Sequence, residues 1–162
     1  MIFKTESKQT TISKKVSLKG VGLHTGQEVE INFLPAEIND GYKFCRIDLE
    51  GHPIINADAN LVTNTQRGTC LERNGVTIQT CEHVLAALVG LEIDNVIIEL
   101  SASEPPIMDG SSKYFIEALE SAEIKELDAF REVFIVKDVI SYVDEESGSE
   151  ITIIPSEEYQ VT

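Results

Sequence analysis

A carboxylate and an imidazole stand next to each other at Glu82 and His83, where apolar residues begin to recur at helical spacing. Both side chains would lie near the amino end of a helix, where a cleft can reach them without disturbing the apolar face. A histidine there could ligate zinc while the neighbouring carboxylate serves as general base. Alone, the pair is a weak signal, because a solvated helix end also favours glutamate at its positive terminus.

The helix that would carry this pair has clear sequence signals. Its apolar residues are Val84, Leu85, Leu88 and Val89. Thr80 is the expected N-cap, and the helix should end near Gly90. Ahead of it, residues 68–72 and 76–79 flank Asn74-Gly75, a dipeptide typical of tight hairpin turns. The sequence therefore predicts a β-hairpin leading directly into the helix.

Other apolar patterns in the sequence predict the strands and the second helix that surround this helix. Alternating or continuous apolar patterns predict strands at residues 12–18, 28–34, 42–49 and 95–100. After the Pro105-Pro106 break, a second helix is expected from the spacing of Tyr114, Phe115, Ala118 and Leu119. Together these patterns predict an α+β fold over residues 1–127, a two-layer sandwich whose mainly antiparallel sheet packs on two helices.

The sequence of residues 128–162 predicts the opening strands of a second domain, similar to the first but truncated. Strand patterns at 133–143 and 150–154 are separated by an acidic turn at 144–148. Two strands alone are marginally stable, and their unpaired edges seek partners. We therefore expect self-association or disorder in this part of the chain, which light scattering and amide protection would detect.

The composition of the chain limits which classes of partner it can bind and which cellular compartment suits it. The net charge of −15 makes most of the surface repel a phosphate backbone, so nucleic acid is not an expected partner. The apolar runs fall far short of the roughly 20 residues that a transmembrane span requires. The 3 cysteines cannot all pair, and the N-terminal residues lack the apolar stretch of a secretory signal. These features favour a reducing cytoplasm.

Four segments of the chain form a recognisable series. They are Gly20-Val21-Gly22-Leu23-His24-Thr25-Gly26, residues 80–88, Gly90-Leu91-Glu92-Ile93-Asp94-Asn95 and Pro106-Ile107-Met108-Asp109-Gly110-Ser111. Their order and spacing resemble the UDP-3-O-acyl-N-acetylglucosamine deacetylases of lipid A synthesis. Residues 65–69 also resemble the strand before that family's hairpin. The chain is similar to the N-terminal half of such an enzyme, and some members carry a fused dehydratase.

The resemblance implies a zinc-dependent amide hydrolase that removes the acetyl group from a UDP-linked acylated glucosamine. The family fold implies an active site where two α/β sandwiches meet. At the family's matching positions, His83 is a zinc ligand and Glu82 is the base that activates the attacking water. His24, Thr65 and Asp109 fall on elements that border the site. A structural hydrogen bond for His24, or ordinary turn chemistry for Asp109, explains these residues as well.

The chain departs from the family pattern in its metal ligands. The family's second sandwich supplies a His-x-x-x-Asp motif and a further acid histidine, and neither occurs in this sequence. Catalytic zinc usually has three protein ligands, so the chain alone is expected to be inactive and to bind zinc weakly or not at all. The alternative is a free-standing, non-catalytic α/β module that binds a sugar nucleotide or a protein partner. A deacetylase assay with metal analysis separates the two hypotheses.

Overall fold

The structure is a computed structural model that describes residues 2–157 and 160–161. It has the α+β fold that the sequence patterns predict. The strands are β1 (Ile2–Ile12), β2 (Val16–Val21), β3 (Glu28–Pro35), β4 (Tyr42–Arg46), β5 (Ile54–Asn56), β6 (Val62–Asn64), β7 (Cys70–Arg73), β8 (Val76–Ile78), β9 (Val96–Leu100), β10 (Ile124–Phe134), β11 (Ile140–Val143) and β12 (Glu150–Ile153). The helices are α1 (Glu82–Gly90), α2 (Lys113–Ser121) and the short 3₁₀ helix η1 (Ala59–Leu61). The predicted fold class is confirmed.

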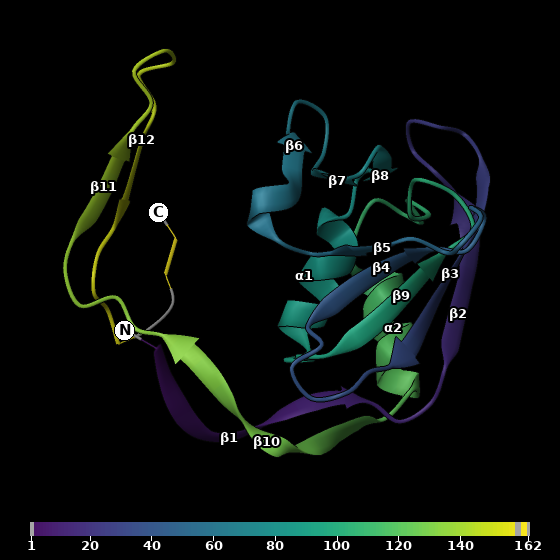
Figure 1. The fold of residues 1–162 in the computed structure, drawn as a ribbon, viewed down its shortest axis with the longest axis horizontal. Coiled ribbons are helices and arrows are strands. Elements are labelled where there is room, and N and C mark those ends of the chain that lie inside the picture. The colour runs from purple at the N-terminus through teal and green to yellow at the C-terminus, as the bar shows by residue number, and fades with distance from the viewer. Residues whose placement is uncertain (1, 158–159, 162) are drawn as a thin grey trace. The chain divides into compact units, whose positions relative to one another are not determined.

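A five-stranded sheet in the order β2-β3-β9-β4-β5 forms one layer. Its neighbouring strands are antiparallel except for β4 and β9, which run parallel. The register pairs Leu18 with Ile31 and Val16 with Phe33, so alternate residues of β2 and β3 share one face. Helices α1 and α2 cover that face (Figure 1). Their fully buried side chains are Val84, Ala87, Leu88, Phe115 and Leu119.

The hairpin ahead of α1 belongs to a three-stranded sheet in the order β6-β7-β8. Asn74 and Gly75 form its turn with φ angles of 53° and 78°, as the Asn-Gly signal predicts. Arg46 at the end of β4 is nearly buried, and its guanidinium donates to the Thr77 carbonyl at 3.0 Å and pairs with Asp48. This contact joins the hairpin to the larger sheet, because a buried guanidinium must satisfy its donors.

The prediction of one strand over residues 12–18 is wrong. β1 ends at Ile12 and β2 begins at Val16. The amide of Ser13 donates to the carbonyls of Ala122 and Glu123, at 3.2 and 2.8 Å, so the chain turns there. β1 pairs with β10, a strand from the opposite end of the sequence.

Two other predicted strands have different bounds in the structure. β4 ends at Arg46, because the Leu49 amide donates to the Arg46 carbonyl in a turn at 3.3 Å. The run predicted as one strand over 133–143 is divided between the end of β10 at Phe134 and β11, which begins at Ile140. The first difference arises where apolar alternation continues into a turn, and the second where it continues through irregular backbone at residues 135–139.

By its contacts the chain divides into two units. One comprises Gln9–Ala129, and the other comprises the described residues of Met1–Lys8 and Phe130–Thr162. In the second unit, β11 and β12 pair so that Ile140 and Tyr142 face Ile153 and Ile151 across one exposed side of the hairpin. That side is formed by isoleucine and tyrosine side chains. Within the described residues, no helix is both long and apolar enough to cross a bilayer.

Candidate functional site at the opening of α1

Helix α1 begins at Glu82, immediately after Cys81, whose side chain makes no capping hydrogen bond. Thr80 is not the N-cap that the sequence predicts. Its φ is 51°, outside the helical region, and its hydroxyl donates to the carboxylate of Glu104 at 2.8 Å. The opening turn is therefore held from outside the helix. Glu82 in this turn also suits the positive end of the helix dipole.

The side chains of Glu82 and His83 are half-buried, so neither is enclosed in the packed core. The backbone amide of Thr69 donates to Oε2 of Glu82 at 2.9 Å and orients the carboxylate. The hydroxyl of Ser112, just before α2, donates to the backbone carbonyl of His83 at 2.9 Å. Both residues are thus fixed by neighbours on separate segments while their side chains stay within reach of solvent.

Gly68 allows the loop between β6 and β7 to pass close to Glu82. Its φ of 149° is rarely adopted by other residues, and a Cβ at this position would lie 3.1 Å from Glu82 Oε1 and 3.3 Å from Thr80 Oγ1. A side chain here would crowd the carboxylate. No role for Gly68 is predicted from the sequence, although a glycine within a predicted strand, here residues 68–72, is a signal of close backbone approach.

Residues 22–26 after β2 form a loop, hereafter the His24 loop. This loop, the loop carrying Gly68 and the segment before α1 line an open hollow of about 360 Å³, hereafter the His24 hollow. Its lining residues are His24, Asn64, Gln66, Arg67, Gly68, Cys70, Gln79 and Thr80. Nε2 of His24 lies 3.0 Å from the carbonyl oxygen of Arg67. Thr65 is exposed in the same loop between two of the lining residues. The structure therefore brings His24 and the loop of Thr65 to the neighbourhood of Glu82.

Glu104 is a buried carboxylate that no sequence pattern marks, and its side chain is fully shielded from solvent. It accepts hydrogen bonds from the backbone amides of His24 and Thr25, at 3.1 and 2.8 Å. The hydroxyls of Thr25 and Thr80 also donate to it, at 2.9 and 2.8 Å. One carboxylate therefore joins the His24 loop to Thr80, two residues before α1. No periodicity reveals such a residue, because its partners lie far away in the sequence.

Acidification is expected to destabilise the chain partly through Glu104. Burial acts to raise the pKa of this carboxyl, but hydrogen bonds from Thr25, Thr80 and His24 outweigh burial and hold the pKa below its ordinary value. Such a group contributes stability above its unfolded pKa and loses it as the pH falls through the folded pKa. Urea unfolding from neutral to acidic pH should show a steeper loss of unfolding free energy in wild type than in Glu104→Gln. Parallel losses would contradict this assignment.

Asp109 lies outside the His24 hollow. Its exposed carboxylate accepts from the amide and the hydroxyl of Ser111, at 3.0 and 2.8 Å, and these bonds hold its pKa below the ordinary value. It lines a separate hollow of about 420 Å³ together with Lys19, Met108 and Tyr114. The contacts of Asp109 are those of an ordinary aspartate turn before a glycine.

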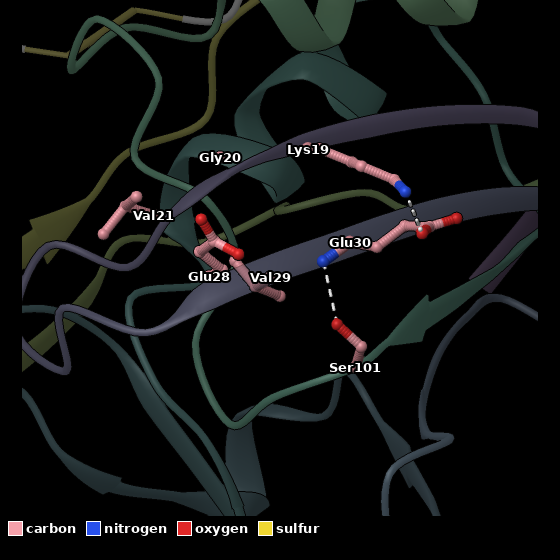
Figure 2. A pocket seen from close by; sticks show the side chains of 7 residues that line it. All are labelled: Lys19, Gly20, Val21, Glu28, Val29, Glu30 and Ser101. Atoms are coloured by element: carbon pink, nitrogen blue, oxygen red, sulfur yellow. Dashed lines mark hydrogen bonds and ion pairs between the residues drawn. The ribbon is translucent and has the colours of Figure 1, made fainter.

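A third hollow, of about 440 Å³, lies over the β2 and β3 strands, and Figure 2 shows its lining side chains. Lys19 reaches across to Glu30, and Nζ lies 3.0 Å from Oε2. The amide of Glu30 donates to the hydroxyl of Ser101 at 2.8 Å. None of the residues predicted for the site lines this hollow. The opening turn of α1 and the His24 hollow therefore form the candidate site.

Comparisons with known proteins show which family this chain is similar to. A family model described as UDP-3-O-acyl N-acetylglycosamine deacetylase (LpxC) matches residues 9–162. A bifunctional enzyme LpxC/FabZ from Bacteroides thetaiotaomicron is 45% identical over 154 residues, which cover 95% of this chain and 33% of that protein. A UDP-3-O-acyl-N-acetylglucosamine deacetylase from Hahella chejuensis is 41% identical over 155 residues, which cover 96% of this chain and 51% of that protein.

The chain thus spans between about a third and about half of the length of these curated relatives. A second bifunctional LpxC/FabZ enzyme, from Porphyromonas gingivalis, is 41% identical over 95% of this chain and 33% of its own length. The matched range contains His24, Glu82, His83 and Asp109. The resemblance seen in the motifs is confirmed, and the chain belongs to the LpxC family of UDP-3-O-acyl N-acetylglycosamine deacetylases.

Proposed function

We propose that this chain supplies the N-terminal part of the active site of a zinc-dependent deacetylase acting on UDP-3-O-acyl-N-acetylglucosamine in lipid A biosynthesis. The observation that carries the proposal is the opening turn of α1, where Glu82 and His83 are adjacent and half-buried. The relative from Hahella chejuensis is named for deacetylation of this substrate. Residues 128–162 would then be the opening strands of the second domain.

Glu82 is proposed as the general base. Its Oε2 is occupied by the amide of Thr69, while Oε1 lies beside Gly68, where no side chain fills the space. The carboxylate is therefore oriented by one oxygen and can take a proton from an attacking water with the other. His24, Thr65 and Asp109 are proposed to border the substrate. Thr65 lies in the loop that orients Glu82, and Nε2 of His24 lies 3.0 Å from the Arg67 carbonyl of that loop.

His83 is proposed as one ligand of zinc. When bound, zinc activates a water for attack and polarises the acetamide carbonyl. Within residues 2–157 and 160–161, no group of three His, Cys, Asp or Glu side chains is placed to hold a metal ion. A single imidazole is too few for a catalytic zinc site. We propose that the other ligands come from the portion of the longer relatives that this chain does not cover.

The decisive experiment compares the chain of residues 1–162 with the full-length protein encoded by its gene. Both are assayed for acetate release from UDP-3-O-acyl-N-acetylglucosamine, and their zinc content is measured. Turnover with about one zinc per molecule is expected only for the full-length protein, since three ligands are needed. Normal turnover and tight zinc binding by the short chain would show that its site is complete and the proposal wrong.

A reading frame that ends near residue 162 would favour the alternative function, a non-catalytic module that binds a sugar nucleotide or a protein partner. In that case calorimetry with a UDP-sugar should show binding without hydrolysis. A cytoplasmic location is proposed from the unpaired thiols of Cys45, Cys70 and Cys81, which fit a reducing compartment. Self-association through the edges of β11 and β12 stays a prediction.

A further inference from the structure

We infer that Glu104 is a positioning residue that fixes the His24 loop against the opening turn of α1. Three segments of the chain meet at the Glu104 carboxylate. Residues 22–26 follow β2, Thr80 precedes α1, and Glu104 follows β9. Two backbone hydrogen bonds flank the junction, from Gln79 to the Ser103 carbonyl at 2.8 Å and from Ile107 to the Val21 carbonyl at 2.9 Å. Glu104 lies between them in the sequence.

The carboxylate of Glu104 is enclosed by its donors. Oε1 accepts from His24 N and Thr80 Oγ1, and Oε2 accepts from Thr25 N and Thr25 Oγ1. A fully buried carboxylate is retained only when hydrogen bonds replace its hydration. Here two of the donors are backbone amides of the His24 loop, so displacing the loop would leave the buried carboxylate without them.

Gly22 shows how closely the loop approaches Glu104. A Cβ built at Gly22 would lie 2.5 Å from Oε2 of Glu104 and 2.4 Å from Oγ1 of Thr25. Real side chains do not tolerate such distances, so the loop passes as near to the carboxylate as the backbone permits. This approach makes the position of the His24 loop dependent on the Glu104 side chain.

The contacts around the His24 hollow form a closed circuit. Glu104 links the His24 loop to Thr80, and the chain continues from Thr80 into Glu82. The amide of Thr69 donates to Glu82, and two residues earlier the Arg67 carbonyl meets Nε2 of the His24 ring at 3.0 Å. His24 is therefore held at both its backbone and its ring. Glu104 acts through this circuit, since its hydrogen bonds go to His24, Thr25 and Thr80.

Amide hydrogen exchange on the chain of residues 1–162 tests the positioning directly and requires no activity. In Glu104→Gln, which keeps the shape but loses one acceptor oxygen and the charge, exchange at the amides of His24 and Thr25 should rise about tenfold. The matched control is Asn95→Ala, because Asn95 is also buried and bonds to Gly41 N and Gln9 at 3.0 Å. Unchanged exchange in Glu104→Gln, or an equal rise in Asn95→Ala, would overturn the inference.

A pair of Thr80 variants keeps the test open if Glu104→Gln does not fold. Thr80→Ser retains the hydroxyl that donates to Glu104 and should keep the His24 amide protected. Thr80→Ala removes the hydroxyl and should increase exchange at both His24 and Thr25. Equal protection in the two variants would show that the Thr80 contact does not hold the loop.

The consequence for catalysis rests on the proposed function and is measured in the full-length protein. Glu104→Gln should lower kcat about 10²-fold with KM little changed, as expected when reacting groups are slightly misplaced. In a His24→Ala background the same change should cost much less, because both act through one loop. Independent effects would sink the positioning role. An inactive wild-type protein would instead sink the proposed function and leave the exchange result standing.

Discussion

Glu82→Gln is expected to lower kcat of the full-length protein by about 10²- to 10⁴-fold, the range that a general base contributes. Glutamine keeps the shape of the side chain, and its amide oxygen can still accept the hydrogen bond from Thr69 that Oε2 accepts in wild type at 2.9 Å. It cannot take a proton from water. The fold and KM should therefore be preserved while turnover is lost, which steady-state kinetics on purified protein will measure.

Glu120→Gln is the matched control for this experiment, because it makes the same chemical change on an exposed residue of α2. Its kcat should stay within about twofold of wild type, since surface changes away from the site have little effect. Zinc content is measured in all three proteins so that metal loss is separated from loss of the base. A Glu82→Gln enzyme that retains more than a tenth of wild-type turnover would remove Glu82 from the role of base.

The elements nearest the candidate site could be predicted from sequence because their signals are local. Asn74 and Gly75 adopt the positive φ angles that a tight hairpin turn requires. The apolar spacing after Glu82 predicts α1, although Val84 and Leu88 are buried as expected while Val89 is 64% exposed and Ala87 is buried in its place. The β-branched run after Asn95 is the central strand β9. Each of these signals lies within one element, so no distant partner was needed to interpret it.

The N-terminal strand could not be predicted in the same way. Lys14 and Lys15 fall between two alternating runs, and nothing local shows that the chain turns there. The turn is set by hydrogen bonds from Ser13 to Ala122 and Glu123. Strand register depends on the partner, and this partner lies over 100 residues away, as 122 minus 13 shows. The alternating pattern therefore predicts a single strand where the structure has the end of β1 and the start of β2.

Glu104 illustrates the same limit within the candidate site. In the sequence it stands between Ser103 and Pro105, where a glutamate indicates a solvated loop. In the structure it is fully buried, and its donors come from His24, Thr25 and Thr80. The position of Thr80 just before the helical apolar spacing predicts an N-cap, but its hydroxyl donates to Glu104 instead. The residues that do chemistry were visible as a motif, whereas the residues that hold them in place were not.

Phe115→Ala is expected to destabilise the chain by about 3–5 kcal/mol, the cost of replacing a buried phenylalanine with alanine. The Phe115 ring is fully buried and meets Phe33 of β3 edge to face, with centroids 6.4 Å apart and planes at 75°. This pair attaches α2 to the sheet, and Ser112 at the start of α2 bonds to the carbonyl of His83. Urea unfolding of the chain measures the loss.

Tyr114→Ala provides the control for Phe115→Ala, because it removes an aromatic ring from the adjacent position of α2 that is 40% exposed. Its cost should be less than about 1 kcal/mol, as for other surface changes. In Phe115→Ala the His83 end of α1 should also exchange its amides faster, since Ser112 loses its support. A loss below about 1 kcal/mol in Phe115→Ala would mean that α2 is held to the sheet by other contacts.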